Sequence, residues 1–488
     1  MAEHSMNTGP LQATEPWLSR RAVLGILSIV LFVSISTRIL GALGDLWLDE
    51  IWSLAFALRA DGPWEILTGT NHDNNHWLNT LYLWLVGDAS SLYAYRFLAV
   101  FTGIGTVLLV TLHGLRRSGM AAITTATLIG CSYILIHVQS EARGYGPAIF
   151  FGLGAFLALH GFLQSRRWTL GLLYAVSATL AVLSQLTFAW VLVGMVAWSW
   201  AAYRQHRVAA SGNLRVLRNT QLIPHLPPTL ILLGLFWLDV RHWTIGGSPP
   251  NPPEAALQSL GQLTLGVPGP GWAIGLASLT AILICLRELW LMGRAGDPSV
   301  FFFSISVFVG PILFVVLMDL PFLYPRYLVV SIPFLLLLLG RALNRLGDSS
   351  HFGRWAWAGL LLTFLLGNMA QTAGLLSEGR GQYSAAVNHI IESSAEKSIF
   401  VAGIGETPQS SLLTFYADRL PGGDRIRIIP PDEIGPDLQW IVVQELQANG
   451  PAPEETLSLD ERTFALVGSY GHRGPSGWTW HLYRQREF

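Results

Sequence analysis

The sequence predicts a polytopic α-helical membrane protein with a small α/β domain at its C-terminus. Of its 488 residues, 51% are hydrophobic and only 12% are charged, whereas a soluble protein carries about 25% charged residues. Apolar runs of roughly 20 residues, long enough to cross a bilayer, recur over residues 20–375. Beyond residue 376 the apolar runs shorten and become punctuated by Pro and Gly. Together these observations exclude a soluble globule and a disordered chain.

About eleven segments are apolar and long enough to be membrane spans. They lie at about 22–41, 94–115, 120–138, 146–164, 168–185, 187–203, 222–240, 271–291, 299–318, 325–343 and 355–375. A further apolar run, Trp77–Val86, is about ten residues long and too short to cross, so we expect a helix lying at the membrane interface. The first span has the length of a retained anchor, although the arginines before it also fit a signal peptide.

Arginines predict the orientation, because short loops rich in arginine stay in the cytoplasm. If the run Trp77–Val86 does not cross, the arginine pairs beside the first, second and fourth spans all fall on the cytoplasmic side. We therefore predict a multi-pass protein of the cell membrane, with a cytoplasmic N-terminus and an extracytoplasmic C-terminal domain that is periplasmic in a Gram-negative cell. The 30 basic and 31 acidic side chains nearly cancel, so the charge does not point to nucleic acid.

We divide the chain into a membrane domain, residues 1–375, with a first outer loop at about 42–93, and a soluble outer domain, residues 376–488. The outer domain has an amphipathic helical pattern over Gln382–Ser394. Short β-rich runs follow it at Ser398–Ala402, Arg425–Ile429, Leu438–Gln444, Thr463–Val467 and Thr479–Arg484. With roughly 110 residues, this domain is just large enough to hold its own core.

Four polar clusters fall at one depth on the predicted outer face. They hold Asp49 and Glu50, then His72, Asp73 and His76, then Glu141, Arg143 and Tyr145, and finally Arg326 and Tyr327. Ionisable side chains at a membrane boundary are costly to desolvate. Their concentration on one face therefore predicts a functional site there.

The adjacent carboxylates Asp49 and Glu50 are the predicted catalytic pair. Asp49 can act as a general base that accepts the proton of an acceptor hydroxyl, while Glu50 caps a helix, binds a sugar hydroxyl or holds a partner in place. The alternative is that the pair only caps an amphipathic helix over Ile51–Ala60, where negative charge suits the helix dipole.

Arg326 and Tyr327 are the predicted phosphate-binding side chains, because guanidinium offers several donors to phosphate oxygens and tyrosine adds another. A snorkelling arginine beside an aromatic belt is the alternative. Glu141 and Arg143 have two interpretations in the same way, an ordinary interface ion pair or contacts to a ligand.

The stretch from His72 to His76 has three interpretations. We expect a polar rim that contacts a sugar or the acceptor, and a purely solvated loop is the main alternative. A transition-metal site is disfavoured, because the spacing lies in a probable loop and no cysteine or further histidine supports a tetrahedral site.

Three short motifs of the outer face together resemble a known family. Leu48-Asp49-Glu50 looks like the Asp-Glu signature of membrane glycosyltransferases of the GT-C fold, which include the protein O-mannosyltransferases and the lipid A aminoarabinose transferase. Gln139–Tyr145 is similar to the family's second outer loop, and Pro325–Leu328 to the segment near the lipid phosphate. The likeness covers about residues 20–375. It departs at Asn74–Asn79, where family members often carry a His-x-Pro-Pro-Leu-Tyr-like run; this concerns the acceptor or sugar preference more than the reaction type.

The resemblance implies transfer of a single sugar from a polyprenyl-phosphate carrier to a hydroxyl acceptor, which is a lipid, a glycan or a protein, on the outer face of the membrane. The phosphate would lie near Arg326, Tyr327 and Arg143, and Asp49 would take the acceptor proton in one inverting displacement. Sugar or acceptor contacts would come from Glu141, Tyr145, His72, Asp73 and His76. The only lysine, Lys397, lies in the outer domain, so arginine, tyrosine and backbone donors must hold the phosphate.

No cofactor is required by this scheme. A divalent cation, Mg²⁺ or Mn²⁺, held among Asp49, Glu50 and Asp73 is the alternative to neutralisation by arginines.

The rival function is a transporter or flippase of lipid-linked sugars. Such a protein should carry ionisable residues deep inside its spans and helices broken at the midplane. Here the charges gather at one face, and the span interiors read as nearly charge-free. A receptor or scaffold that only needs anchoring would not require about eleven spans.

Overall fold

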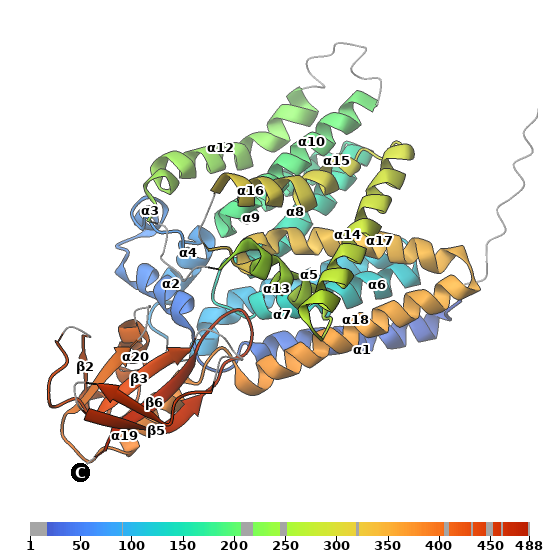
Figure 1. The fold of residues 1–488 in the computed structure, drawn as a ribbon. Helices are drawn as coiled ribbons and strands as arrows, with labels where there is room; N and C mark the ends of the chain where they lie inside the picture. The colour runs from blue at the N-terminus through green and yellow to red at the C-terminus, as the bar shows by residue number, and fades with distance from the viewer. Residues whose placement is uncertain are drawn as a thin grey trace, which may run out of the picture.

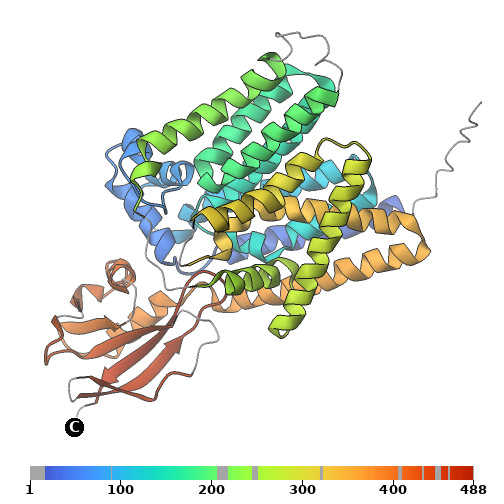
Figure 2. The same cartoon turned by 45° about the horizontal axis from the view of Figure 1, so that its top comes forward.

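The computed structural model describes residues 17–89, 91–205, 218–244, 251–318, 322–404, 409–430, 433–445, 452–459 and 462–486. Long helices form one body, and a domain built on a β-sheet lies at one end of it (Figure 1). The turned view gives the same arrangement (Figure 2). The predicted fold class, a polytopic helical protein with a small C-terminal α/β domain, is confirmed.

Nine helical segments of the described residues are long and apolar enough to cross a membrane. Their helices are α1 (Arg20–Gly41), α5 (Leu92–Leu115), α8 (Tyr145–Ser165), α10 (Ala189–Gln205), α12 (Ile223–Leu238), α14 (Gly271–Arg294), α15 (Val300–Phe303) with α16 (Gly310–Met318), α17 (Ile332–Ser349) and α18 (His351–Glu378). Each overlaps a predicted span, because a long apolar run in lipid has to satisfy its backbone within a helix.

The other two predicted spans are helical but fall below this length. α9 (Trp168–Ser184) has 17 residues, and the segment 120–138 divides into α6 (Gly119–Gly130) and α7 (Tyr133–Val138). Arg38 of α1 satisfies the broken backbone there, because its guanidinium donates to the carbonyl oxygens of Gly130 at 2.7 Å and Ile129 at 3.2 Å. Since Arg38 is fully buried within a predicted span, the expectation of nearly charge-free spans missed it.

Among the described residues before the C-terminal domain, four further α-helices lie outside the predicted spans. α2 (Leu48–Arg59) begins three residues before the predicted Ile51, so Asp49 and Glu50 lie in its first turn. α3 (Pro63–Thr68) follows it, and α4 (Trp77–Val86) has the predicted bounds and a length of about 15 Å, too short to cross. α13 (Pro253–Leu265) was not predicted, because its sequence mixes polar and apolar residues.

The C-terminal domain combines two helices with a mixed sheet. Its elements are α19 (Tyr383–Glu392), β1 (Ile399–Ile404), α20 (Gln409–Ala417), β2 (Ile426–Ile429), β3 (Trp440–Glu445), β4 (Thr456–Leu459), β5 (Arg462–Tyr470) and β6 (Thr479–Gln485). The strand order is β2-β1-β3-β6-β5-β4. β1 runs parallel to β2 and β3, and the other pairs are antiparallel. The sequence predicted α19 and five of these strands, but not α20 or the four-residue β4.

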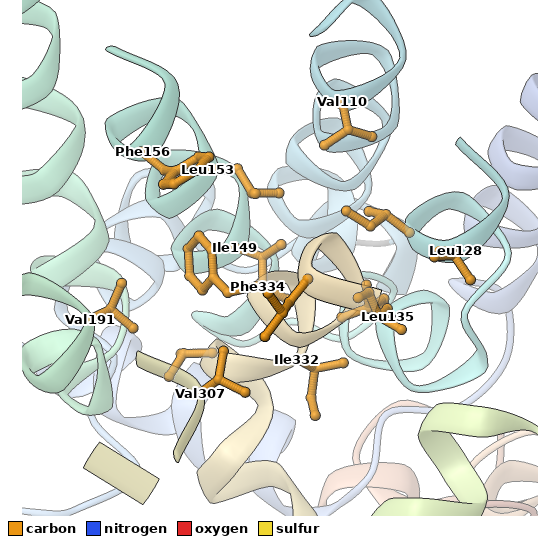
Figure 3. Close-up of a cluster of buried hydrophobic side chains, with 14 of the residues drawn as sticks. Val110, Leu128, Leu135, Ile149, Leu153, Phe156, Val191, Val307, Ile332 and Phe334 are labelled. Atoms are coloured by element: carbon orange, nitrogen blue, oxygen red, sulfur yellow. The ribbon is translucent and has the colours of Figure 1, made fainter. Parts of the chain in front are cut away.

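Two large hydrophobic cores hold the chain together. One fills the helical body, where Ile332 and Phe334 of α17 pack among Leu135 of α7 and Ile149 of α8 (Figure 3). The other joins α2 and the short helix α4 to α19, α20 and one face of the sheet. A smaller cluster lies elsewhere in the sheet domain. The C-terminal domain therefore has a small core of its own but shares its larger core with the first outer loop.

A fully buried ion pair between Glu50 and Arg96 holds the turn after α1. Nε and Nη2 of Arg96 donate to the two carboxylate oxygens at 2.7 and 2.6 Å. The carboxylate also accepts the backbone amides of Trp47 at 3.2 Å and Ala142 at 2.6 Å. The other guanidinium donors reach the carbonyl oxygens of Ala42, Gly44 and Asp45. This pair therefore joins the start of α2, the start of α5 and the loop after α7.

Glu50→Gln should lower the free energy of unfolding by about 3–5 kcal/mol, because it leaves the Arg96 guanidinium buried without its counter-charge. Arg419→Ala is the control: it removes an ion pair with the largely exposed Asp88 and should cost less than about 1 kcal/mol. Equilibrium unfolding of the detergent-solubilised variants measures both. Equal losses in the two variants would mean that the Glu50–Arg96 pair does not hold the turn.

Candidate active site

A cavity of about 660 Å³ lies where the first outer loop meets the helical body. It brings together eight of the ten predicted site residues. These are Asp49, His72, Asp73, His76, Arg143, Tyr145, Arg326 and Tyr327. They come from four segments that are far apart in the sequence, so the cavity is a product of the tertiary fold.

The charged centre of the cavity is Asp49 between two arginines. Its Oδ2 lies 2.9 Å from Nη1 of Arg143 and 3.5 Å from Nη1 of Arg326. The Arg143 side chain is 5% exposed and the Arg326 side chain 18%. Two guanidinium groups thus face one carboxylate in a site largely withdrawn from water, which leaves one positive charge without a counter-charge within this trio.

Aromatic rings pack against both guanidinium groups. The Trp47 ring lies 5.7 Å from Cζ of Arg143 and 5.5 Å from Cζ of Arg326. Each arginine also packs against a second ring. The Tyr145 ring lies 5.0 Å from Cζ of Arg143, and the Tyr324 ring lies 4.7 Å from Cζ of Arg326. These separations fall within the range of cation–π attraction. The arginines are therefore held in place before any ligand binds.

Asn74 connects the first outer loop to this centre. Its side-chain amide donates to the carbonyl oxygen of Asp49 at 2.8 Å and to the hydroxyl of Ser53 at 3.2 Å. Its carbonyl oxygen accepts a short hydrogen bond from Nη2 of Arg143. Asn74 thus fixes the arginine relative to the helix that carries Asp49.

The histidines lie on the side of the cavity formed by the first outer loop. The His76 ring packs against Tyr145, with ring centroids 5.3 Å apart. Burial, together with the positive charge of Arg143, lowers the pKa of His76 to about 3, so His76 is neutral at physiological pH. Nδ1 of His72 lies 3.0 Å from Oδ1 of Asp73, and its ring packs against Trp52.

Part of the lining is apolar and comes from two helices of the helical body. Leu232, Leu233 and Phe236 of α12 and Phe314 and Met318 of α16 form it. Both helices belong to candidate membrane spans. The cavity therefore combines charged side chains with apolar side chains of the helical body.

Glu50 and Glu141 are not among the lining residues. Both oxygens of Glu50 are taken by Arg96 and by backbone amides, which fits the helix-capping alternative better than a catalytic position. Oε1 of Glu141 lies 2.9 Å from Nε2 of His137 and 3.1 Å from Nε of Arg380. Glu141 therefore belongs to a buried network behind the cavity and does not pair with Arg143.

Several residues that build the site were not predicted. Asp239, at the end of α12, is fully buried and accepts hydrogen bonds from the Asn71 amide at 3.1 Å and from Nε1 of Trp77 at 2.8 Å. Arg38 and Asp239 carried a usable signal, since an ionisable residue inside an apolar span has to find a polar partner. Asn74 lies within the polar stretch from His72 to His76, although its own role was not predicted, and Arg380 lies in a turn and carried no such signal.

The described residues contain no group of three or more His, Cys, Asp or Glu side chains arranged to hold a metal ion. Asp49, Glu50 and Asp73, the predicted ligands of a divalent cation, turn to different partners. Asp49 faces Arg143 and Arg326, Glu50 pairs with Arg96, and Asp73 lies beside His72. The three carboxylates therefore do not fit a shared cation, and the arginines supply the positive charge of the cavity.

Sequence comparison finds no matching family model and no matching curated protein. Among solved structures, the chain is similar to ArnT from Cupriavidus metallidurans in the apo state, with 13% identity, a TM-score of 0.47 and coverage of 94% of this chain and 96% of that chain. ArnT bound to undecaprenyl phosphate gives 14% identity, a TM-score of 0.46 and coverage of 94% and 97%.

An oligosaccharyltransferase from Archaeoglobus fulgidus in complex with Zn and sulfate is also similar, with 10% identity, a TM-score of 0.47 and coverage of 86% of this chain and 68% of that chain. Both neighbours are GT-C glycosyltransferases, the family that the sequence motifs resemble. With TM-scores below 0.5, these likenesses carry no conclusion about substrate or mechanism. Those have to come from the side chains of the cavity.

Proposed function

We propose that this protein is a membrane glycosyltransferase that moves a single sugar from a polyprenyl-phosphate carrier to a hydroxyl acceptor. The observation that carries this proposal is Asp49 between Arg143 and Arg326 in a cavity that is also lined by apolar side chains of two candidate membrane spans. A ligand that fits such a lining has an anionic head and a long hydrocarbon tail. A polyprenyl phosphate has this chemistry.

The two arginines are suited to the leaving phosphate. Each guanidinium presents several donors to phosphate oxygens, and Tyr327, which lines the same cavity, adds a hydroxyl. As the bond between the anomeric carbon and the phosphate oxygen breaks, negative charge grows on the phosphate. Preorganised positive charge in a site largely withdrawn from water stabilises that charge without reorganisation.

Asp49 is suited to receive the acceptor proton. The acceptor oxygen attacks the anomeric carbon from the face opposite the phosphate, a new carbon–oxygen bond forms, and the hydroxyl proton passes to the carboxylate in one inverting displacement. Both arginine contacts use Oδ2 of Asp49. When the phosphate takes over the guanidinium donors, Oδ2 becomes available to the acceptor. Tyr145, His72, Asp73 and His76 line the same cavity and are the proposed sugar and acceptor contacts.

We propose further that the cavity faces the extracytoplasmic side, with the N-terminus in the cytoplasm. Support comes from the arginine-rich loops at the opposite ends of the helices. Asp88→Cys, between α4 and α5, should react with a membrane-impermeant maleimide added outside intact cells, whereas Arg167→Cys should react only after permeabilisation. Both positions are exposed, and the native Cys131 and Cys285 are buried. The reverse pattern would invert the orientation.

Asp49→Asn should lower kcat about 100-fold or more, because it removes the general base. Donor affinity should not fall, since the arginines lose a competitor for the phosphate. The measurement is sugar transfer by the purified protein in liposomes, from a panel of radiolabelled polyprenyl-phosphate sugars to extracted envelope acceptors, with Asp88→Asn as a surface control. A folded Asp49→Asn variant with the parent rate would exclude Asp49 as the base. Movement of the labelled lipid across the bilayer without sugar transfer would favour the rival flippase function.

Arg326→Ala should raise the donor KM about 10- to 100-fold, because it removes a charge-assisted contact to the phosphate. Arg326→Lys keeps the charge but loses the fork geometry, so an intermediate value is expected. Arg59→Ala, which removes an exposed arginine of α2, serves as the control. Binding of undecaprenyl phosphate, followed by thermal stabilisation of the protein, gives the affinity independently of turnover. Unchanged affinity in Arg326→Ala would remove this residue from the phosphate site.

A further inference from the structure

Two residues of the C-terminal domain contact residues that lie next to the cavity lining. One is Arg380, in the turn between α18 and α19. The other is Trp478, in the loop between β5 and β6. Neither residue lines the cavity, but each touches a residue that holds one or both of the arginines beside Asp49.

Arg380 points from the domain junction into the helical body. It stands between Gly379 and Gly381, whose φ angles of +68° and +141° favour glycine and allow a sharp turn. Its side chain is nearly fully buried. The guanidinium donates to Oε1 of Glu141 at 3.1 Å and to the hydroxyl of Ser140 at 2.9 Å. It also donates to the carbonyl oxygens of Gly41 at 2.8 Å and His137 at 2.7 Å.

These contacts fix the loop that carries Arg143. The Arg143 amide donates to the carbonyl oxygen of Glu141 at 2.7 Å. The amide of Ala142 is held by Glu50, and its carbonyl oxygen by the side chain of Asn79 at 2.9 Å. Hydrogen bonds from Arg380 therefore hold one side of the backbone that leads to Arg143. The position of the Arg143 guanidinium depends on these bonds.

Trp478 supports the other element of the charged centre. Its ring meets the Trp47 ring edge-on, with centroids 6.4 Å apart, a favourable geometry for aromatic pairs. Trp47 in turn lies beneath the guanidinium groups of both Arg143 and Arg326. The backbone amide of Trp478 donates a hydrogen bond to the hydroxyl of Tyr383 in α19 at 2.9 Å, which fixes the position of Trp478. The domain thus braces the ring on which the two arginines rest.

We propose that the C-terminal domain positions the phosphate-binding arginines, through Arg380 and Trp478, and is for this reason part of the catalytic unit. This inference rests on the proposed glycosyltransferase function. Two guanidinium groups repel each other, so holding them close together before the donor binds needs rigid support from behind. Support of this kind raises the rate of the chemical step, because the stabilising charge is preorganised. Arg380 and Trp478 are positioning residues and touch neither donor nor acceptor.

The test uses the full-length protein with Trp478→Ala, Trp478→Phe and Arg380→Lys. Arg484→Ala is the matched control, because Arg484 also lies over a tryptophan of the same domain, Trp440, but has no contact to the cavity among the described contacts. Trp478 is only partly buried, so its variants should fold even if the Arg380 variant does not. Three quantities are measured: kcat, the acceptor KM, and amide exchange of the peptide covering residues 139–144.

Trp478→Ala should lower kcat about 10- to 100-fold, since a displacement of about 1 Å can have this effect, with the acceptor KM unchanged. Trp478→Phe should restore most of the rate, because it keeps a ring against Trp47. Arg380→Lys should lower kcat and speed exchange over residues 139–144. Arg484→Ala should match the parent in every measurement.

Two results would overturn this inference alone. One is a raised acceptor KM with unchanged kcat in Trp478→Ala, which would mean that the domain recognises the acceptor. The other is parent-like kcat and exchange in both Trp478→Ala and Arg380→Lys. If the parent transfers no sugar, the proposed function fails instead. Amide exchange in Arg380→Lys and undecaprenyl phosphate binding by Trp478→Ala then still decide whether the domain holds the arginines: faster exchange with weaker binding supports it, and parent-like values reject it.

Discussion

The buried pair between Glu50 and Arg96 is the interaction on which the region around the cavity depends. One carboxylate, fully withdrawn from water, binds a guanidinium and two backbone amides, from Trp47 and Ala142. Two of these residues stand next to a residue of the cavity in the sequence, because Asp49 precedes Glu50 and Arg143 follows Ala142. Adjacent carboxylates thus have opposite tasks. Glu50 orders the scaffold, and its neighbour Asp49 faces the cavity.

The same end of the molecule meets a second constraint, which the membrane imposes. Backbone groups that leave a helix within an apolar body have to find partners inside the protein. Three buried arginines, Arg38, Arg96 and Arg380, donate to carbonyl oxygens where α1 ends, where α6 gives way to α7 and in the last turn of α7. Their charge is balanced in part by Glu50 and Glu141. Two groups of charged residues can therefore be distinguished. Arg38, Arg96 and Arg380 bind backbone carbonyl groups, and Asp49, Arg143 and Arg326 face the cavity.

Much of this architecture is legible in the sequence. The apolar runs located all nine candidate spans found among the described residues. The bounds of α4 were predicted without error, and the composition change near residue 376 marked the sheet domain. The break at Cys131 was not predicted, because apolar residues continue on both sides of it and the partner that makes a break tolerable, Arg38, lies on another helix. α13 and β4 were not predicted for a different reason: their polar and apolar residues show no helical or strand periodicity long enough to recognise.

By itself, the sequence determined the fold class and the short list of charged residues at one membrane face. Burying a charge in lipid is so costly that a charged residue beside an apolar run is already a candidate for function. Only the tertiary structure decided which of those residues share a cavity. It turned Asp49 towards Arg143 and Arg326, and it turned Glu50 and Glu141 towards Arg96 and Arg380. A carboxylate next to another in sequence carries no record of the direction in which its side chain points. That direction follows from helix phase and from partners that are distant in the sequence, such as Arg326 for Asp49 and Arg380 for Glu141.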